Sequence, residues 1–436
     1  MKNHPAKVFS LGFQHVLAMY GGAVVVPLIV GGALGLTTEQ LAYLVAIDLL
    51  TCGIATLLQV WTNRFFGIGL PVVLGCTFTA VGPMIAVGGS YGIPAIYGSI
   101  IASGIVVILI AGFFGKLLKF FPPVVTGSVV TIIGLTLIPV ALKDMAGGVG
   151  SPDFGSLDNL ALAFGVLAFI LILNRFFTGF VRAVSILLGL VVGTVVAYAM
   201  GKIDLSPVAE ASWFHMPQLF YFGMPTFEWG AILTMSLVAI VSMVESTGVF
   251  LALGKICDRD LKPADLTRGY RAEGLAVVLG GIFNAFPYTT FSQNVGLVQL
   301  SKVKTRDVIV AAGVILIVLG LLPKFATLAT IIPSPVLGGA MVAMFGTVVA
   351  SGIKMLGGVD FSKDENLLII ACSVGLGLGV SVVPEFFAQL PSGIRILFDN
   401  GIVAGSITAI ALNIFFNMGS RTARVEVPQQ SRVKAS

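Results

Sequence analysis

The chain has 436 residues, of which 57% are hydrophobic and 10% charged, and its formal net charge is +5. Soluble domains carry about 25% charged residues, so this composition excludes a water-soluble protein and predicts an all-α polytopic membrane protein in contact with a lipid bilayer. The basic residues are distributed along the chain and are not gathered in one patch, which argues against nucleic acid as a partner.

Apolar segments long enough to cross a bilayer, about 17–25 residues each, recur from end to end. We predict fourteen spans: 8–34, 42–60, 68–88, 94–114, 122–142, 160–178, 183–200, 230–254, 271–286, 291–301, 308–322, 326–351, 366–383 and 400–418. Pro, Gly and polar residues interrupt the regions 68–88 and 271–301. The N-terminus lacks a signal-peptide cleavage pattern, so we expect its first apolar segment to be a retained helix.

The Lys and Arg residues predict the orientation of these helices. With both termini in the cytoplasm, 21 of the 25 basic residues lie on the cytoplasmic side, and the outside keeps only Lys143, Lys202, Lys324 and Arg395. The positive-inside rule favours this orientation. Two termini on one side also require an even number of spans, as in the fourteen predicted here.

Sequence motifs for metal binding, disulfides and nucleotide chemistry are missing. The four cysteines lack CxxC spacing, no His/Asp/Glu cluster has zinc-ligand spacing, and there is no GxxxxGK[ST] loop. No nucleophile–base pair points to an enzyme. We therefore expect a carrier without a cofactor or metal, driven by an ion gradient.

Two local patterns occur twice at nearly the same offset. Phe78 and Phe291, each beside hydroxyl residues and downstream of a proline, are 213 positions apart, and Pro123 and Pro335, in similar Pro-Val motifs, are 212 apart. The repetition predicts two halves, residues 1–220 and 221–436, of seven helices each.

An odd number of spans per half inverts the second half in the membrane. Inverted repeats with interrupted helices at corresponding positions mark the substrate sites of many transporters. Irregular backbone at membrane depth is tolerated only where it lines a cavity or is buried in protein. We therefore expect short extended segments and a binding site in 68–88 and 286–302; the alternative is that Pro71 and Pro287 only kink ordinary helices.

Few ionisable groups lie inside the apolar segments. Glu245 is far from either end of its predicted helix, Glu273 is near the predicted start of its helix, and His15 is in the first helix. A carboxylate at membrane depth is costly, so a direct role with substrate or proton is expected for Glu245.

Each of these groups also has a structural interpretation. Glu245 could be a structural carboxyl hydrogen-bonded among Ser242, Ser246 and Thr247. Glu273 could match the dipole of a helix start, and His15 could be a core histidine that bonds across helices. Asp48, in the second span, remains unassigned.

The pair Gln293 and Asn294 adds neutral hydrogen-bonding groups next to the second interrupted segment. An amide presents both a C=O and an NH₂, so it can pair with a planar heterocycle that carries adjacent N–H and C=O groups. With Glu245 and the rings of Phe78 and Phe291, this favours a flat, polar, uncharged or weakly acidic ring over amino acids or sugars.

Residues 293–302, Gln-Asn-Val-Gly-Leu-Val-Gln-Leu-Ser-Lys, resemble the signature of the nucleobase–ascorbate transporters, also called nucleobase:cation symporter-2. That signature is Gln, Glu or Pro, then Asn-x-Gly, four variable residues and Thr; here Ser301 keeps the hydroxyl of the usual Thr. Further matches along the chain are His15, Thr77, Phe78, Glu245 and Glu273. The chain resembles bacterial xanthine permeases most, and urate permeases next.

The resemblance implies a fold of fourteen helices in a seven-plus-seven inverted repeat. A core domain would comprise helices 1–4 and 8–11, a gate domain helices 5–7 and 12–14, and substrate would bind between broken helices 3 and 10. It implies that Glu245 and Gln293 bond the purine and that the backbone around Phe78 and Ser292 completes the site. Further implied roles are site geometry for Asn294 with Gly296, proton coupling for Glu273 and Glu245, a supporting position for His15, and purine selectivity for Thr77.

One departure concerns the proton route. Many members of the family place Asp or His four residues after the Glu of helix 8, where this chain has Val249. Glu245 or Glu273 must then carry more of that route.

The sequence thus predicts a proton-coupled xanthine symporter of the bacterial cytoplasmic membrane, working by alternating access. The Gln at position 293 favours xanthine or urate, since uracil carriers of the resembled family tend to have Glu there. Urate or a broader purine and uracil range remains an alternative, and an anion carrier or channel of the same fold is a more distant one. We expect a homodimer, although the sequence does not decide the oligomeric state.

Overall fold

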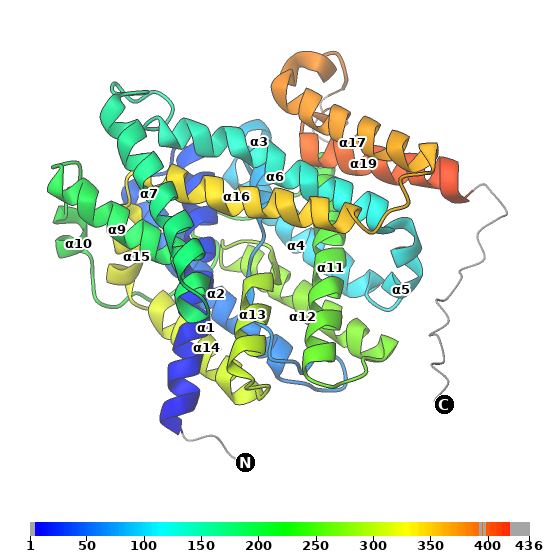
Figure 1. The fold of residues 1–436 in the computed structure, drawn as a ribbon, viewed down its shortest axis with the longest axis horizontal. Coiled ribbons are helices and arrows are strands. Elements are labelled where there is room, and N and C mark those ends of the chain that lie inside the picture. The colour runs from blue at the N-terminus through cyan, green and yellow to red at the C-terminus, as the bar shows by residue number, and fades with distance from the viewer. Residues whose placement is uncertain (1–4, 392–394, 396–397, 419–436) are drawn as a thin grey trace.

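The computed structural model describes residues 5–391, 395 and 398–418, which form a helical protein with two short strands (Figure 1). The first half of the chain contains α1 (Pro5–Ala33), α2 (Thr38–Val60), β1 (Leu74–Cys76), the 3₁₀ turn η1 (Phe78–Ala80), α3 (Val81–Tyr91), α4 (Ile93–Ile110), α5 (Phe114–Leu117), η2 (Leu118–Phe120), α6 (Pro123–Met145), α7 (Leu157–Phe176), α8 (Phe180–Ala183), α9 (Ser185–Ala199) and α10 (Ser206–Glu210).

The second half follows the same order of long helices, strand and short helix. It contains α11 (Trp229–Ile256), α12 (Pro263–Ile282), β2 (Tyr288–Thr290), α13 (Ser292–Ser301), α14 (Arg306–Gly320), α15 (Pro323–Thr330), α16 (Ser334–Leu356), α17 (Asp364–Val382), η3 (Pro384–Phe387), α19 (Gly401–Asn413) and the π-helical turn η4 (Ile414–Met418).

Eight helices in the described part of the chain are long and apolar enough to cross a membrane: α1, α2, α4, α6, α7, α11, α16 and α17. The helices α14 and α15 form a further pair, bent by 79° at the break between them. These apolar helices confirm the prediction of an all-α polytopic membrane protein.

Two predicted spans have the wrong bounds. The span 326–351 is divided between α15 and α16, because Pro335 occupies the first turn of α16, where a proline costs no helical hydrogen bond. The span predicted at 271–286 starts at Pro263 instead, also a first-turn proline, and the capping carboxylate of Asp265 accepts from the Lys262 N–H at 2.9 Å. The helix therefore extends into a polar segment that hydropathy does not mark.

The two strands pair antiparallel in the middle of the protein. Their register is Leu74↔Thr290, Gly75↔Thr289 and Cys76↔Tyr288, and the pairing continues through a Thr77 N–H bond to the Pro287 carbonyl at 3.0 Å. The prediction of extended backbone in both interrupted regions is confirmed. The alternative that two prolines only kink ordinary helices is wrong, because both precede strands outside any helix.

Gly75 permits a close approach at the centre of this strand pair. A Cβ atom at this position would lie 2.2 Å from the ring of Phe291, far inside van der Waals contact. The ring of Phe291 therefore lies directly against the backbone of β1.

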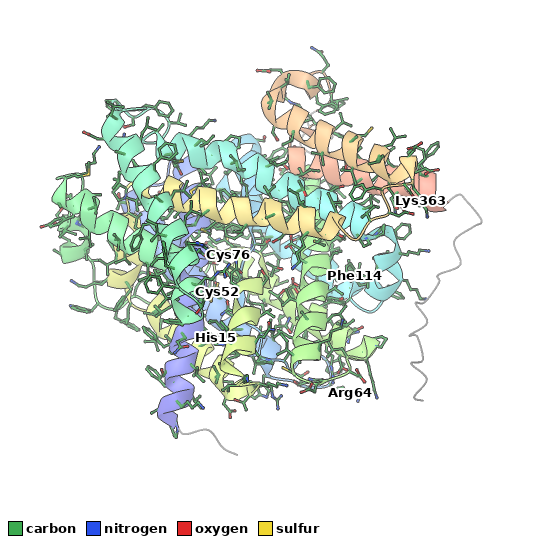
Figure 2. All side chains as sticks on the ribbon, in the orientation of Figure 1. His15, Cys52, Arg64, Cys76, Phe114 and Lys363 are labelled. Atoms are coloured by element: carbon green, nitrogen blue, oxygen red, sulfur yellow. The ribbon has the colours of Figure 1, made fainter. Side chains whose placement is uncertain are left out.

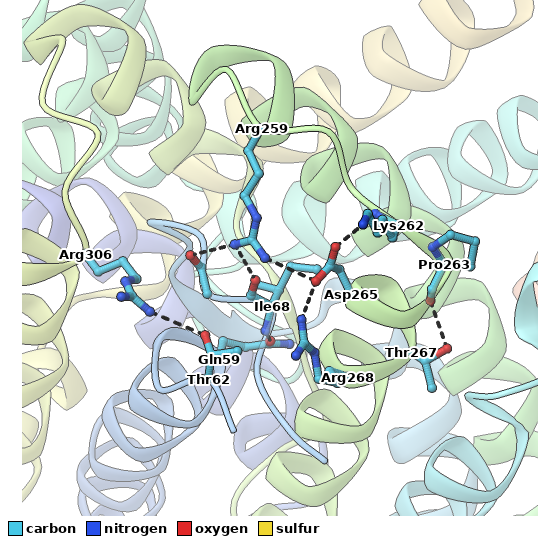
Figure 3. Close-up of polar contacts among 11 residues, drawn as sticks. Gln59, Thr62, Ile68, Arg259, Lys262, Pro263, Asp265, Thr267, Arg268 and Arg306 are labelled. Carbon is cyan, nitrogen blue, oxygen red and sulfur yellow. Dashed lines mark hydrogen bonds and ion pairs between the residues drawn. The ribbon is translucent and has the colours of Figure 1, made fainter. Parts of the chain in front are cut away.

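A polar network holds the irregular segment that leads into β1 (Figure 3). The Arg259 guanidinium donates to the carbonyls of Ile68 at 3.0 Å and Gly69 at 3.2 Å, and to Asp265 Oδ1 at 3.1 Å. Arg268 also bonds Asp265, and Gln59 donates to the Gly269 carbonyl at 2.8 Å. The network joins the end of α2 and the start of α12 to the chain before β1.

The helices α6 and α16 pack along each other (Figure 1). Glycines make this approach possible: a Cβ at Gly134 would lie 2.6 Å from Val349, and one at Gly352 would lie 2.4 Å from Thr131. Small residues allow membrane helices to pack at short distance without a hydrophobic driving force.

Candidate functional site

A cavity of about 420 Å³ lies where the strand pair, α11, α6 and α16 meet. Five predicted site residues line it: Thr77, Phe78, Glu245, Ser292 and Gln293. The chain brings them together from three places, namely the residues after β1, the middle of α11 and the start of α13. The volume is within the range of about 300–1,000 Å³ that is typical of small-molecule sites.

The carboxylate of Glu245 lies on this cavity with little hydrogen bonding from the protein. Its Oε1 accepts one long bond, 3.5 Å from Thr79 Oγ1. The proposed structural partners are engaged elsewhere: Ser242 donates to Thr77 Oγ1 at 3.5 Å, and Thr247 bonds the Met243 carbonyl and Tyr270. The interpretation of Glu245 as a structural carboxyl among these hydroxyls is therefore wrong, and its remaining acceptor capacity faces the cavity.

The start of α13 adds backbone donors to the same cavity. The first N–H groups of a helix have no intrahelical acceptor, and Ser292 and Gln293 occupy this first turn. Just before it, the Phe291 N–H donates to the Val73 carbonyl at 2.9 Å, which holds the helix start against β1. The ring of Phe78 lies edge-on to that of Phe345 from α16, with 5.7 Å between centroids.

Asn294 and His15 lie next to the cavity and do not line it. The Asn294 Nδ2 donates to the His15 carbonyl at 3.0 Å and lies 3.0 Å from His15 Nδ1, which links α13 to α1. Figure 2 marks the position of His15. Both side chains are buried. At Gly296, by contrast, a Cβ would meet no atom within 4 Å, so no close contact requires a glycine there.

Glu273 is buried in the interior of α12, ten residues beyond the helix start at Pro263. Its predicted alternative role at a helix start is therefore wrong. Ser246 Oγ donates to Glu273 Oε1 at 2.9 Å and also bonds Thr289 Oγ1 at 3.1 Å in β2. Within the described residues the Glu273 Oε2 has no hydrogen-bond partner. Ser246 thus joins this carboxyl to the strand pair, a contact that the sequence pattern did not indicate.

The opposite wall of the cavity was missed by reasoning from sequence. It comes from α6 and α16 and the turn before α6, and it combines two aromatic or thioether side chains with three hydroxyls: Phe121, Met355, Thr126, Thr347 and Ser351. The repeated Pro-Val motifs at the starts of these two helices were the available signal, because they already indicated corresponding positions in the two halves. Val249 also lines the cavity, so the departure from the resembled family leaves an apolar surface there.

No group of three or more His, Cys, Asp or Glu side chains that could hold a metal ion occurs in the part of the chain that the structure describes. The cavity is lined by hydroxyls, one carboxylate, one amide, aromatic rings and many aliphatic side chains.

An interrupted strand–helix pair around a central cavity defines a multi-pass membrane transporter. A solved structure of the transmembrane domain of a cyanobacterial bicarbonate transporter, BicA, has the same fold, with a TM-score of 0.62 and 15% identity over 94% of this chain and 99% of that one.

A model described as "Permease family" matches residues 6–386, so the chain belongs to this family, that of the nucleobase–ascorbate transporters, and is a transporter and not an enzyme. It is 68% identical to a nucleobase transporter, PlUacP, of Paenibacillus larvae, over 95% of this chain and 96% of that protein. It is 66% identical to a xanthine permease of Bacillus subtilis, over 98% and 97%. It is 64% identical to the uric acid permease PucK of Bacillus subtilis, over 95% and 96%.

Proposed function

We propose that this protein is a proton-coupled symporter that imports xanthine across the bacterial cytoplasmic membrane by alternating access. The observation that carries the proposal is the presence of Glu245 and Gln293 on one cavity of about 420 Å³. The names of the relatives, which include a nucleobase transporter, a xanthine permease and a uric acid permease, support a purine as the substrate class.

The chemistry of the two side chains fits a purine dione. Glu245 accepts N–H bonds from the ring, and the Gln293 amide pairs with an edge that offers an N–H and a C=O. The first-turn N–H groups at Ser292 and Gln293 complete the polar contacts, and Phe78 stacks or packs against the flat ring. Thr77 is placed to tune selectivity, while Asn294, with His15 behind it, supports the geometry of the site.

Proton coupling is assigned to Glu273 together with Glu245. Ser246 connects Glu273 to Thr289 of β2, so a change in the proton occupancy of Glu273 alters the hydrogen bonds of the strand that lines the substrate site. Because Val249 supplies no proton-carrying group, these two carboxyls carry the route. The proton gradient is the driving force, and no cofactor takes part.

The proposed architecture is a pair of inverted repeats, residues 1–220 and 221–436, of seven membrane segments each. Segments 1–4 and 8–11 form the core domain and segments 5–7 and 12–14 the gate domain. The cavity then lies between the two domains, with the strand pair and α11 on the core side and α6 and α16 on the gate side. We propose a homodimer with both termini in the cytoplasm.

Urate is the second candidate substrate, because uric acid permeases are among the similar proteins. Urate has one more ring carbonyl than xanthine and would use the same carboxylate and amide. An anion carrier or channel is disfavoured, because the cavity offers a carboxylate and its lining, among the described residues, includes no basic side chain.

The test is uptake of labelled xanthine by cells that lack their own purine carriers. Saturable uptake that a protonophore abolishes and sodium removal leaves unchanged is expected, with competition by xanthine stronger than by urate, guanine or uracil. Stronger competition by urate would show that urate, and not xanthine, is the preferred substrate. Uptake that follows the sodium gradient would overturn the role of Glu273.

A further inference from the structure

Asp48 is a third carboxyl near the strand pair, and the proposed mechanism does not use it. It lies in α2, is 0% exposed, and does not line the cavity. Among the residues that the structure describes, it takes part in no ion pair. A carboxyl in this position is costly to bury, so its contacts need an explanation.

The contacts of Asp48 converge on the end of the strand pair. The Tyr288 hydroxyl, from the first residue of β2, donates to Asp48 Oδ1 at 3.1 Å. Tyr288 is paired across the strands with Cys76, the last residue of β1, whose thiol donates to the Ala23 carbonyl of α1 at 3.6 Å. One side chain of α2 therefore holds Tyr288 directly and restrains Cys76 through the strand pairing.

The rest of the cluster completes this attachment. Cys52, one turn further along α2, donates from its thiol to Asp48 Oδ2 at 3.7 Å, and Thr51 Oγ1 bonds the Tyr288 hydroxyl. Figure 2 marks Cys52 and Cys76 in the interior of the fold. Both carboxyl oxygens of Asp48 thus have partners, unlike those of Glu245.

The attached residue, Tyr288, is next to the substrate cavity. Its cross-strand partner Cys76 and its neighbour in sequence Thr289 both line the cavity. A binding group held in place before the ligand arrives loses less conformational entropy on binding. Loosening the pair at Cys76 and Tyr288 would therefore weaken substrate binding without removing any substrate contact.

We propose that Asp48 is a positioning residue for substrate binding: through Tyr288 it fixes the strand pair to α2, and it acts as a hydrogen-bond acceptor whose negative charge is not required. The inference rests on the proposed function, because its test measures the apparent affinity for the transported purine. The proposal gives Asp48 and Glu245 different roles, since the negative charge of Glu245 is expected to be required for uptake.

The test compares four variants by KM and maximal uptake rate, normalised to the amount of protein in the membrane. Asp48→Ala and Tyr288→Phe are each expected to raise KM at least tenfold while the maximal rate stays within threefold. Asp48→Asn keeps an acceptor oxygen for the Tyr288 hydroxyl and is expected to restore KM to within threefold of the wild-type value.

Tyr270→Phe is the matched control. Tyr270 is as buried as Tyr288 and its hydroxyl bonds Thr247 Oγ1 at 2.6 Å, but it lies in α12 and lines no part of the cavity. Its KM should remain within twofold of the wild-type value. An equal rise in KM for Tyr270→Phe would show a general effect of losing a buried tyrosine hydroxyl and would overturn the proposal.

Other outcomes of these measurements also test the proposal. Loss of uptake in Asp48→Asn would show that the charge is needed, and an unchanged KM in Tyr288→Phe would show that the attachment does not matter; either result overturns the proposal. If Asp48→Ala does not reach the membrane, Tyr288→Phe and Asp48→Asn decide alone. The ratios are taken with whichever purine the wild-type protein imports, so an error about xanthine leaves the test intact, whereas a wild-type protein that imports no purine contradicts the proposed function.

Discussion

Glu245 and Asp48 are both carboxyls near the strand pair, but Asp48 is fully buried and Glu245 is only half-buried. Glu245, from α11, lines the cavity and accepts one long bond at 3.5 Å. Asp48, from α2, lies outside the cavity lining and has partners on both oxygens, at 3.1 Å and 3.7 Å. The comparison shows that the carboxyl we propose for substrate binding differs from a positioning carboxyl in two ways: it is partly exposed to a cavity, and it keeps unfilled hydrogen-bonding capacity.

The largest effect is expected for Glu245→Gln, which replaces the carboxylate by an amide with one acceptor oxygen. Hydrogen bonds to charged groups contribute about 1.5–3 kcal/mol each, so the loss of one substrate bond and the weakening of the other should lower uptake roughly 100-fold. Uptake of labelled purine at equal membrane levels measures this. Wild-type uptake by this variant would contradict the proposed site and remove the contrast with Asp48.

The second largest effect is expected for Gly75→Ala. This variant tests the strand pair, which lies next to both Glu245 and Asp48. The added Cβ would lie 2.2 Å from the Phe291 ring, so the ring and the start of α13 must move. Overpacking costs about 1–3 kcal/mol, and we expect a roughly tenfold or larger loss of purine affinity, measured by binding to the purified protein.

Gly89→Ala is the control for that substitution. Gly89 lies in α3, and a Cβ there meets no atom within 4 Å. Because alanine is favoured over glycine in a helix by about 0.5–1 kcal/mol, this variant should bind purine normally. A similar loss of affinity in both variants would show that the contact between Gly75 and Phe291 is not the cause.

A smaller effect is expected for Ser246→Ala, which weakens the connection between β2 and Glu273. The substitution removes the donor to Glu273 Oε1 and the bond to Thr289. A buried polar group left without a partner costs about 1–3 kcal/mol, so uptake should fall roughly tenfold and its pH profile should change.

Ser373→Ala controls for the loss of a buried serine. Ser373 is 0% exposed, but it bonds only carbonyls of its own helix, Ile369 and Ile370. Its uptake should match that of the wild-type protein. An unchanged pH profile in Ser246→Ala would separate Ser246 from the proton route.

The smallest effect is expected for Cys52→Ala in the region of Asp48. A thiol is a weak donor, and the bond from Tyr288 to Asp48 remains, so KM should change by less than about twofold. A tenfold change in KM would mean that the Cys52 thiol, and not Tyr288, holds the Asp48 carboxyl in place. The difference between Asp48 and Glu245 would then depend on that thiol.

The membrane class, the two interrupted regions and the principal polar groups of the cavity could be predicted from the sequence. Prolines, hydroxyls, an amide pair and Glu245 are unusual at membrane depth, because each must find a partner away from water. They can therefore be recognised one at a time, without knowing what they contact. The wrong start of α12 has the converse cause: its first turns are polar, and hydropathy does not detect a helix that extends out of the apolar region.

Which of these groups face the same cavity, and which hold its strands in place, depends on contacts between distant parts of the chain. Tyr288 and Asp48 are 240 residues apart, and Ser246 and Glu273 belong to different helices. The wall from α6 and α16 also combines residues from both halves of the chain. Local composition carries no information on such pairings, because they depend on the register of two strands and on how closely glycine-containing helices pack.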